Sequence, residues 1–294
     1  MHPQLTLYKE AAASVINTAF EIEKLDDGCA FSEGPVWNPE GFYLYSDIPA
    51  NAIYKIVPGQ KKEVYIKPSG CTHQSIELLS DQIGSNGLAY DKNGALFICQ
   101  HGNGAVAKAT GHQAEVFLSS PCDKPFNSPN DIVVHSNGTI YFSDPPYGLK
   151  DAKLNPAIRQ STTPFYAWRN GKLNAFCTQY QFPNGLCISP DGSSLYICSN
   201  KPFERFILEY DTITLERKRV VAAENGDGIK CDQHGNLYLC TKEGVLIIDE
   251  NGERLAKIGL ETIPANCCWG GAFGNDLFIT ARQNLFLIRN LQKR

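Results

Sequence analysis

After about residue 20, apolar residues alternate with polar ones or form runs of four to six that are rich in Tyr, Phe, Ile and Val. Helical periodicity is scarce there, so the pattern predicts an almost entirely β structure. Turn signals recur at separations that suit antiparallel strands, at Asn93-Gly94, Asn137-Gly138, Asp191-Gly192, His234-Gly235 and Asn251-Gly252. Residues 1–19 are expected to form an N-terminal arm, either a short helix or irregular.

A repeat runs through this pattern. In each copy, a residue with a side-chain oxygen, here called the anchor, is followed eight positions later by a glycine and then by an apolar stretch. The six pairs are Glu33 with Gly41, Asn86 with Gly94, Asn130 with Gly138, Asn184 with Gly192, Asp227 with Gly235, and Asn266 with Gly274. The anchors lie 53, 44, 54, 43 and 39 residues apart, a spacing typical of four-stranded propeller blades. We therefore predict one all-β domain over residues 20–294, a six-bladed β-propeller with four antiparallel strands per blade.

In a propeller the anchors would begin the innermost strands, so six oxygen-bearing side chains would converge at one mouth of the central channel. The alternative is that Asn86-Gly87 and Asn184-Gly185 are simple hairpin turns. A second turn signal follows in the same register both times, which favours the channel. The alternating segment 20–25, FEIEKL, is expected to supply an outer strand that closes the last blade.

Four anchors suit a hard cation: Glu33, Asn130, Asn184 and Asp227. Carboxylate and amide oxygens are the ligands that calcium prefers, and two carboxylates balance a divalent charge. Nearby glycines and prolines indicate a fixed backbone around these side chains. Taken singly, each residue is better explained as a turn or cap residue. Their common register favours a shared site.

The chain resembles the SMP-30/gluconolactonase/regucalcin-like family of six-bladed propeller lactonases from about Phe31 to Ile288. The resemblance is carried by FSEGPVW (31–37), SNGLAYD (85–91), FNSPNDIVV (126–134), YFSDPPYGL (141–149), PNGLCISPDG (183–192), GDGIKCDQHGNLYL (226–239) and WGG (269–271). It implies a divalent metal at the channel mouth, with the family's ligands falling on the same four anchors. Calcium is expected, with Zn²⁺, Mg²⁺ and Mn²⁺ as alternatives.

The reaction that the resemblance implies is hydrolysis of a sugar lactone, gluconolactone-like, to the corresponding acid. Asp227 would be the catalytic residue, as the general base that activates water. A metal-bound carboxylate has a lowered proton affinity, so a metal-bound hydroxide competes with that assignment. Bacterial relatives usually follow the His-Gly of the second blade with paired arginines. This chain instead continues from Gly102 with Asn103, Gly104, Ala105 and Val106, which leaves the substrate in doubt.

Further residues are candidates for binding the substrate: Asn86, His101, Asn130 and Tyr147. A turn role is equally compatible with Asn86, a structural role with His101, and core packing with Tyr147. Asn266 and Trp269 are expected to shape the space beside the metal or to pack in the core. His234, in a turn, is expected to face solvent.

The composition limits the classes of molecule that this protein is expected to bind. With 20% charged residues and a net charge of −4, nothing favours binding to nucleic acid or to an anionic membrane, and no apolar run is long enough for a transmembrane helix. We read no secretory signal, and most of the 11 cysteines sit in apolar runs, as expected of buried reduced thiols in a cytoplasmic protein. A monomer or small homo-oligomer that binds a small-molecule lactone is expected.

Two other functions are compatible with the same residues. One is an organophosphate or aryl-ester hydrolase that uses the same metal centre. The other is a non-catalytic calcium-binding propeller that serves as a scaffold. The presence of two carboxylates and two amide ligands argues against a scaffold, because gathering charge at the axis is costly.

Overall fold

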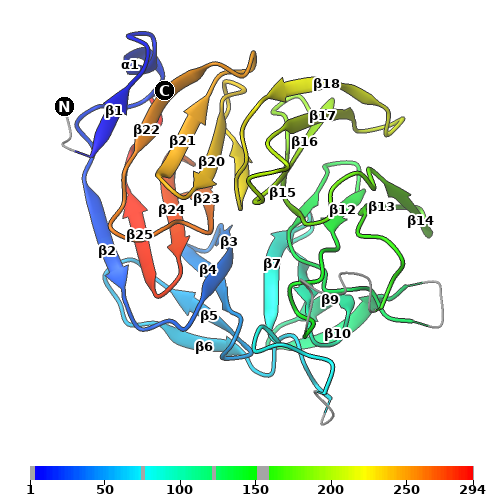
Figure 1. Ribbon diagram of the computed structural model, residues 1–294. Coiled ribbons are helices and arrows are strands. Elements are labelled where there is room, and N and C mark those ends of the chain that lie inside the picture. The colour runs from blue at the N-terminus through cyan, green and yellow to red at the C-terminus, as the bar shows by residue number, and fades with distance from the viewer. Residues whose placement is uncertain (1–3, 74–76, 121–123, 151–158, 294) are drawn as a thin grey trace.

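The structure, a computed structural model, describes residues 4–73, 77–120, 124–150 and 159–293. The strands of these residues form six antiparallel sheets arranged around a central axis (Figure 1). The six innermost strands contact one another in a closed ring, in the order β3, β7, β11, β15, β19, β23 and back to β3. The predicted six-bladed β-propeller is therefore confirmed.

Each blade is an antiparallel meander, described from the axis outward. Blade 1 contains β3 (Ser32–Asn38), β4 (Phe42–Asp47), β5 (Ala52–Ile56) and β6 (Glu63–Ile66). Blade 2 contains β7 (Ser85–Tyr90), β8 (Leu96–Gln100), β9 (Ala105–Thr110) and β10 (Gln113–Leu118). Blade 3 contains β11 (Ile132–Val134), β12 (Ile140–Ser143), β13 (Phe165–Arg169) and β14 (Lys172–Phe176). Blade 4 contains β15 (Pro183–Ile188), β16 (Ser194–Ser199), β17 (Ile207–Asp211) and β18 (Arg217–Ala222).

The last two blades use strands from both ends of the chain. Blade 5 contains β19 (Ile229–Cys231), β20 (Leu237–Thr241), β21 (Gly244–Ile248), β22 (Arg254–Ile258) and, outermost, β1 (Leu5–Leu7). Blade 6 contains β23 (Asn266–Gly270), β24 (Asp276–Ala281), β25 (Asn284–Ile288) and, outermost, β2 (Ile22–Asp26). The closing strand expected at 20–25 is therefore confirmed, since β2 lies beside β25 in blade 6 (Figure 1).

The segment before β2 lies against blades 5 and 6. It contains the short helix α1 (Ala12–Val15), and β1 pairs with β22, a role that the sequence did not indicate. Ile16 forms an isolated bridge with Gln292, so both ends of the chain lie at the same edge of the propeller. No helix in the described ranges is long and apolar enough to cross a membrane.

The apolar core lies between neighbouring blades. Leu44 and Ile53 of blade 1, for example, pack against Leu88 and Ile98 of blade 2, and Ile53 and Ile98 are fully buried. Burial of this kind is the main favourable contribution to folding. Because the faces between blades take up the apolar side chains, polar side chains are left to face the axis.

The cysteines fit this scheme. Each of the ten cysteines in the described ranges is free, and eight of them are buried. Cys267 and Cys268 are packing residues, as predicted, and form no disulfide. The eleventh, Cys122, lies outside the described residues.

Candidate active site at the channel mouth

The anchors lie where the innermost strands begin. Glu33, Asn86 and Asn184 are the second residues of β3, β7 and β15, Asn266 is the first residue of β23, and Asn130 and Asp227 precede β11 and β19 by two residues. Asn86-Gly87 and Asn184-Gly185 are therefore in strands, and the alternative of hairpin turns is wrong. The glycines eight residues later all have positive φ, from 70° to 100°, as turn residues do.

The glycine after an anchor lets adjacent blades approach closely. The Gly87 N–H donates to the carbonyl oxygen of Asn130 at 2.7 Å, and the Gly185 N–H donates to that of Asp227 at 2.9 Å. A Cβ atom on Gly185 would lie only 2.5 Å from the Asp227 oxygen. The strand register also shifts at both positions, a bulge that turns the anchor side chain toward the axis. The local sequence thus places each anchor against the next blade.

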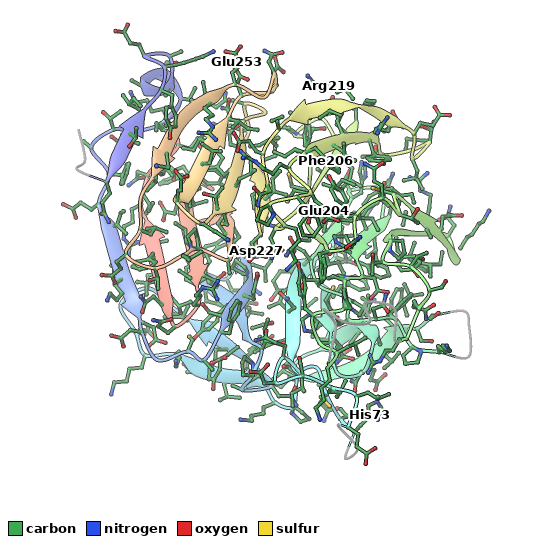
Figure 2. All side chains as sticks on the ribbon, viewed as in Figure 1. His73, Glu204, Phe206, Arg219, Asp227 and Glu253 are labelled. Carbon is green, nitrogen blue, oxygen red and sulfur yellow. The ribbon has the colours of Figure 1, made fainter. Side chains whose placement is uncertain are left out.

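Five of the six anchors line a cavity of about 210 Å³ at the channel mouth. Figure 2 labels one of them, Asp227, near the centre of the propeller. The complete lining is Phe31, Glu33, Ile48, Gln82, Asn86, His101, Asn130, Tyr147, Asn184, Asn200 and Asp227. Every candidate catalytic, substrate-binding and metal-binding residue chosen from the sequence is in this set.

Neighbouring anchors are joined by a chain of hydrogen bonds. Asn86 Nδ2 donates to Asn130 Oδ1 at 2.7 Å, Asn130 Nδ2 donates to Asn184 Oδ1 at 2.9 Å, and Asn184 Nδ2 donates to Asp227 Oδ1 at 2.5 Å. All three amides are buried. Such a chain fixes the orientation of each side chain through the next one. Asn86 is the first residue in this series of hydrogen bonds, and its Oδ1 atom is buried without a hydrogen-bond partner among the described residues.

The two carboxylates of the cavity disfavour each other's ionisation. Glu33 is only 3% exposed. Burial, together with the charges of Asp227 and Asp131, raises the pKa of Glu33 well above its ordinary value. Burial also raises the pKa of Asp227 to about 6, although hydrogen bonds from Asn184 and Asn200 and the charges of Arg282 and Lys201 oppose that shift. Burial therefore disfavours the ionised form of both carboxylates.

The residues present fit a hard divalent cation. Two carboxylates that repel one another, several amide oxygens and an unpartnered oxygen on Asn86 together form an oxygen-rich donor set. No group of three or more His, Cys, Asp or Glu side chains in the described ranges is arranged to hold a metal ion. A site built from imidazole and thiolate ligands, of the kind zinc prefers, is therefore absent from that part of the chain.

His101 faces the cavity as a neutral imidazole. Its Nδ1 lies 3.0 Å from the Gln82 carbonyl oxygen, to which it donates, so Nε2 is the unprotonated nitrogen. Nε2 lies 3.4 Å from Asn86 Nδ2. Burial lowers the pKa of His101 to about 4, against a smaller opposing effect of the Gln82 carbonyl. Near neutral pH His101 can accept a hydrogen bond from a ligand but cannot donate one through Nε2.

Tyr147 and Asn200 complete the side of the cavity around Asp227. The Tyr147 hydroxyl donates to Asn200 Oδ1 at 2.9 Å, and Asn200 Nδ2 donates to Asp227 Oδ1 at 3.3 Å. Burial and the nearby charge of Asp227 raise the pKa of Tyr147, so it stays a neutral phenol. Asn200, Gln82, Phe31 and Ile48 were missed by sequence reasoning. Asn200 directly follows β16, a second strand, where the repeat marks no position.

A half-buried cation, Arg159, braces the loops that carry His101 and Asn130. The Arg159 guanidinium donates to the carbonyl oxygens of His101, Gly102, Phe126 and Asn127 over 2.9–3.2 Å. The segment after Gly102 lacks the expected paired arginines, yet a cation reaches its backbone from a distant part of the chain. The sequence carried no signal for this contact.

A buried carboxylate supports the same loops. The Asp144 carboxylate accepts hydrogen bonds from the backbone N–H groups of Asn127 and Ser128 at 3.0 and 2.9 Å. Burial raises the pKa of Asp144 to about 7, against the effect of these hydrogen bonds. Asp144 thus holds the start of the segment that leads to Asn130.

Two residues of blade 6, Asn266 and Trp269, make contacts outside the cavity wall. Asn266 donates through Nδ2 to Asp131 at 3.4 Å, and Trp269 donates through its indole N–H to the Cys231 carbonyl at 3.0 Å. Trp269 also packs against Tyr238, with ring centroids 4.8 Å apart, and neither Asn266 nor Trp269 lines the cavity. His234 is exposed, as predicted.

Fold and cavity define a six-bladed propeller with an oxygen-lined pocket at one mouth of its channel. Residues 31–283 match the SMP-30/gluconolactonase/LRE-like region, and the chain belongs to that family. The resemblance recognised in the sequence is confirmed.

Three relatives illustrate the similarity. A gluconolactonase of Zymomonas mobilis is 30% identical over 313 residues, which cover 97% of this chain and 86% of that protein. A solved gluconolactonase of Xanthomonas campestris is 26% identical with a TM-score of 0.83, covering 98% of this chain and 95% of that one. Regucalcin of Agrobacterium tumefaciens, described as a calcium-binding protein, shares the fold at 18% identity with a TM-score of 0.73, over 93% of this chain and 95% of that one.

Proposed function

We propose that this protein hydrolyses a sugar lactone to the corresponding acid in the cavity at the channel mouth, with the help of a divalent cation. The observation that carries the proposal is the convergence of Glu33, Asn130, Asn184 and Asp227 on one polar cavity of about 210 Å³. The gluconolactonases of Zymomonas mobilis and Xanthomonas campestris, which match nearly the whole chain, support the reaction class.

Glu33, Asn130, Asn184 and Asp227 would hold the cation, and calcium suits their oxygen atoms best. When bound, a divalent cation polarises a carbonyl oxygen as a Lewis acid. Its charge would also relieve the repulsion between the Glu33 and Asp227 carboxylates, which otherwise favours protonation of Glu33.

Asp227 is the residue proposed to take the proton from the attacking water. Its two hydrogen-bond donors, Asn184 and Asn200, both converge on Oδ1. This leaves Oδ2 without a hydrogen-bond partner in the described part of the chain. A carboxylate whose pKa is about 6 is suited to accept a proton near neutral pH. A bound cation would lower that proton affinity, so the pH dependence of the reaction reports on the assignment.

The remaining lining residues would orient the substrate. Asn86 Oδ1 is an acceptor without a partner among the described residues, suited to a substrate hydroxyl group. His101 Nε2 would accept from a substrate hydroxyl group in place of its 3.4 Å contact with Asn86 Nδ2. Tyr147 and the amide of Asn130 would position the ring. Phe31 and Ile48 supply the apolar part of the wall.

Proton release from a panel of aldonolactones tests the proposal, with calcium or zinc added in one series and a chelator in another. The wild type should hydrolyse at least one lactone above the spontaneous rate with the cation, and chelation should abolish this activity. Asp227→Asn should lower kcat by about a hundredfold or more, as expected on loss of a general base. Asp27→Asn, at an exposed position outside the cavity, is the matched control.

The outcomes of this panel also separate the alternatives. An absence of lactone hydrolysis in every sample with cation would refute the proposal. Turnover of a p-nitrophenyl ester or a phosphotriester in place of any lactone would favour the aryl-ester or organophosphate hydrolase. Calcium binding without turnover of any of these compounds would favour the scaffold.

A further inference from the structure

A second, smaller cavity adjoins the first one. Its volume is about 80 Å³, and Asn200 and Asp227 line both cavities. The rest of its wall comes from the end of β20 and from connections of blades 4 to 6, including Lys242 after β20 and Arg282 between β24 and β25. The two cavities therefore meet at Asn200 and Asp227.

Two cations flank this side of Asp227, and each lies over an aromatic side chain. The Arg282 guanidinium is 5.1 Å from the centre of the Phe31 ring, which lines the first cavity. Lys201 Nζ is 5.5 Å from the ring centre of Tyr147, another lining residue, and 4.3 Å from that of Phe182. Stacking of this kind holds a cation in place without neutralising its charge.

The Arg282 guanidinium forms no salt bridge among the described residues, although its charge acts on Asp227. Its side chain forms no hydrogen bond or ion pair with any residue in the described ranges, whereas Arg205 and Arg254, in the next cavity, both pair with Glu224. Arg282 also has φ of 57°, in the left-handed region where glycine or asparagine is the usual residue. An exposed arginine thus occupies a turn position in the wall of the side cavity, although arginine rarely adopts the left-handed backbone conformation found there.

The charges support an anionic ligand. With a divalent cation bound, the charges of Glu33 and Asp227 would be balanced, and the positive charges of Arg282 and Lys242 would remain in the wall of the side cavity. A guanidinium presents paired N–H donors that match a carboxylate or phosphate in a bidentate arrangement. A cavity of about 80 Å³ has room for a group of a few heavy atoms.

We infer that the lactone taken by this site carries an anionic substituent, a carboxylate or a phosphate, which Arg282 and Lys242 bind in the side cavity beside Asp227. The inference rests on the proposed function for the nature of the substrate, but the anion site itself is independent of turnover. The competing explanation is that these cations only offset the charges of Glu33 and Asp227, in which case a neutral lactone is preferred.

Three probes distinguish these explanations: glucono-δ-lactone, its 6-phosphate, and a glucaro-lactone that carries a free carboxylate. Hydrolysis is measured by proton release with calcium in excess and at constant ionic strength. At least one of the two anionic lactones should show a kcat/KM about tenfold or more above that of glucono-δ-lactone, through a lower KM. The better of the two identifies the substituent as phosphate or carboxylate.

Arg282→Gln should lower kcat/KM for the preferred anionic lactone about tenfold more than for glucono-δ-lactone. Arg217→Gln changes an exposed arginine at the start of β18 and should leave both values unchanged. If the protein hydrolyses lactones but prefers neither anionic one, or if Arg282→Gln affects neutral and anionic substrates equally, the inference is wrong.

A binding measurement separates failure of the inference from failure of the proposed function. Calorimetry with the two products, 6-phosphogluconate and gluconate, needs no turnover. Tighter binding of 6-phosphogluconate that is lost in Arg282→Gln would support the anion site even for a protein that hydrolyses none of the lactones. Equal affinity for 6-phosphogluconate and gluconate, combined with no preference for the glucaro-lactone, would overturn it.

Discussion

Asp131 and Lys230 meet in the central channel, with Nζ 3.2 Å from Oδ2, although they belong to blades 3 and 5. The Asp131 side chain is 4% exposed and that of Lys230 is 21% exposed. Burial lowers the pKa of Lys230, but the charge of Asp131, the hydrogen bond to it and other nearby groups together raise the pKa above its ordinary value. The pair connects blades 3 and 5, whose strands belong to different sheets. Asp131 directly follows the candidate metal ligand Asn130 in the sequence.

Replacing one partner of this pair should destabilise the fold. Lys230→Met leaves the Asp131 carboxylate buried and unpaired, which costs about 3–5 kcal/mol in comparable cases. Chemical denaturation should show this loss in the free energy of unfolding. The double variant Asp131→Asn with Lys230→Met should recover most of it, because no unpaired charge remains. Equal destabilisation by the single and double variants would show that packing of the lysine stem, rather than the charge pair, stabilises the channel.

Glu33→Gln tests the proposed calcium ligands, because it removes a negative charge without changing the size of the side chain. The variant removes one of the two carboxylates of the cavity, so calcium affinity should fall by about tenfold or more. Without calcium, the same variant should be as stable as the wild type or more stable, because Glu33 is buried next to Asp227 and Asp131. Isothermal titration and thermal unfolding measure the two effects. Glu40→Gln, an exposed position in the same blade, is the control, and unchanged calcium affinity in Glu33→Gln would contradict the site.

The effect of calcium on stability should depend on pH. The folded-state pKa of Asp227 is about 6, above the ordinary value of 3.8. The stability contributed by its protonated form is therefore present at low pH and is lost as the pH rises through about 6. Because a cation stabilises the ionised form, calcium should raise the Tm more at about pH 7.5 than at about pH 5.

Titration of His101 changes the stability of the fold with pH in the opposite direction to titration of Asp227, so the experiment requires a control. Its folded-state pKa is lowered to about 4, so its contribution to stability is lost as the pH falls from about 6.5 to about 4. Comparing samples with and without calcium at each pH cancels that contribution. An equal rise in Tm with calcium at both pH values would show that the cation does not compete with protons at these carboxylates.

Arg159 should matter for substrate binding as well as for stability. Arg159→Ala removes the donor shared by four carbonyl oxygens of two loops, so we expect a loss of about 1–3 kcal/mol in the free energy of unfolding. Because His101 and Asn130 lie on these loops, KM for the lactone should rise more than kcat falls. Arg159→Lys should restore part of the stability but little of the KM, since an ammonium cannot reproduce the guanidinium fork. A fall in kcat with unchanged KM would contradict this role.

The residues of the site that could be predicted from the sequence are those that occupy the anchor position of the repeat. Glu33 and Asn184 could be found because the same register recurs in every blade, and the register places side chains at one mouth of the channel. Asn200 and Gln82 lie outside that register. Arg159 and Lys230 act through partners 58 and 99 residues away along the chain. Single-sequence patterns report local periodicity, so contacts of this kind become visible only in the folded structure.

The pairing of β2 with β25 has a consequence for folding. Ile22 faces Ile288 across this pair, 266 residues apart along the chain, so β2 is synthesised long before the strand with which it pairs. Pairing over such a distance is slow. Until it occurs, β25 presents an open edge to other nascent chains. The ring can thus close only after β25 has been synthesised, and changes in residues 22–26 should lower the yield of folded protein more than the activity of the molecules that do fold.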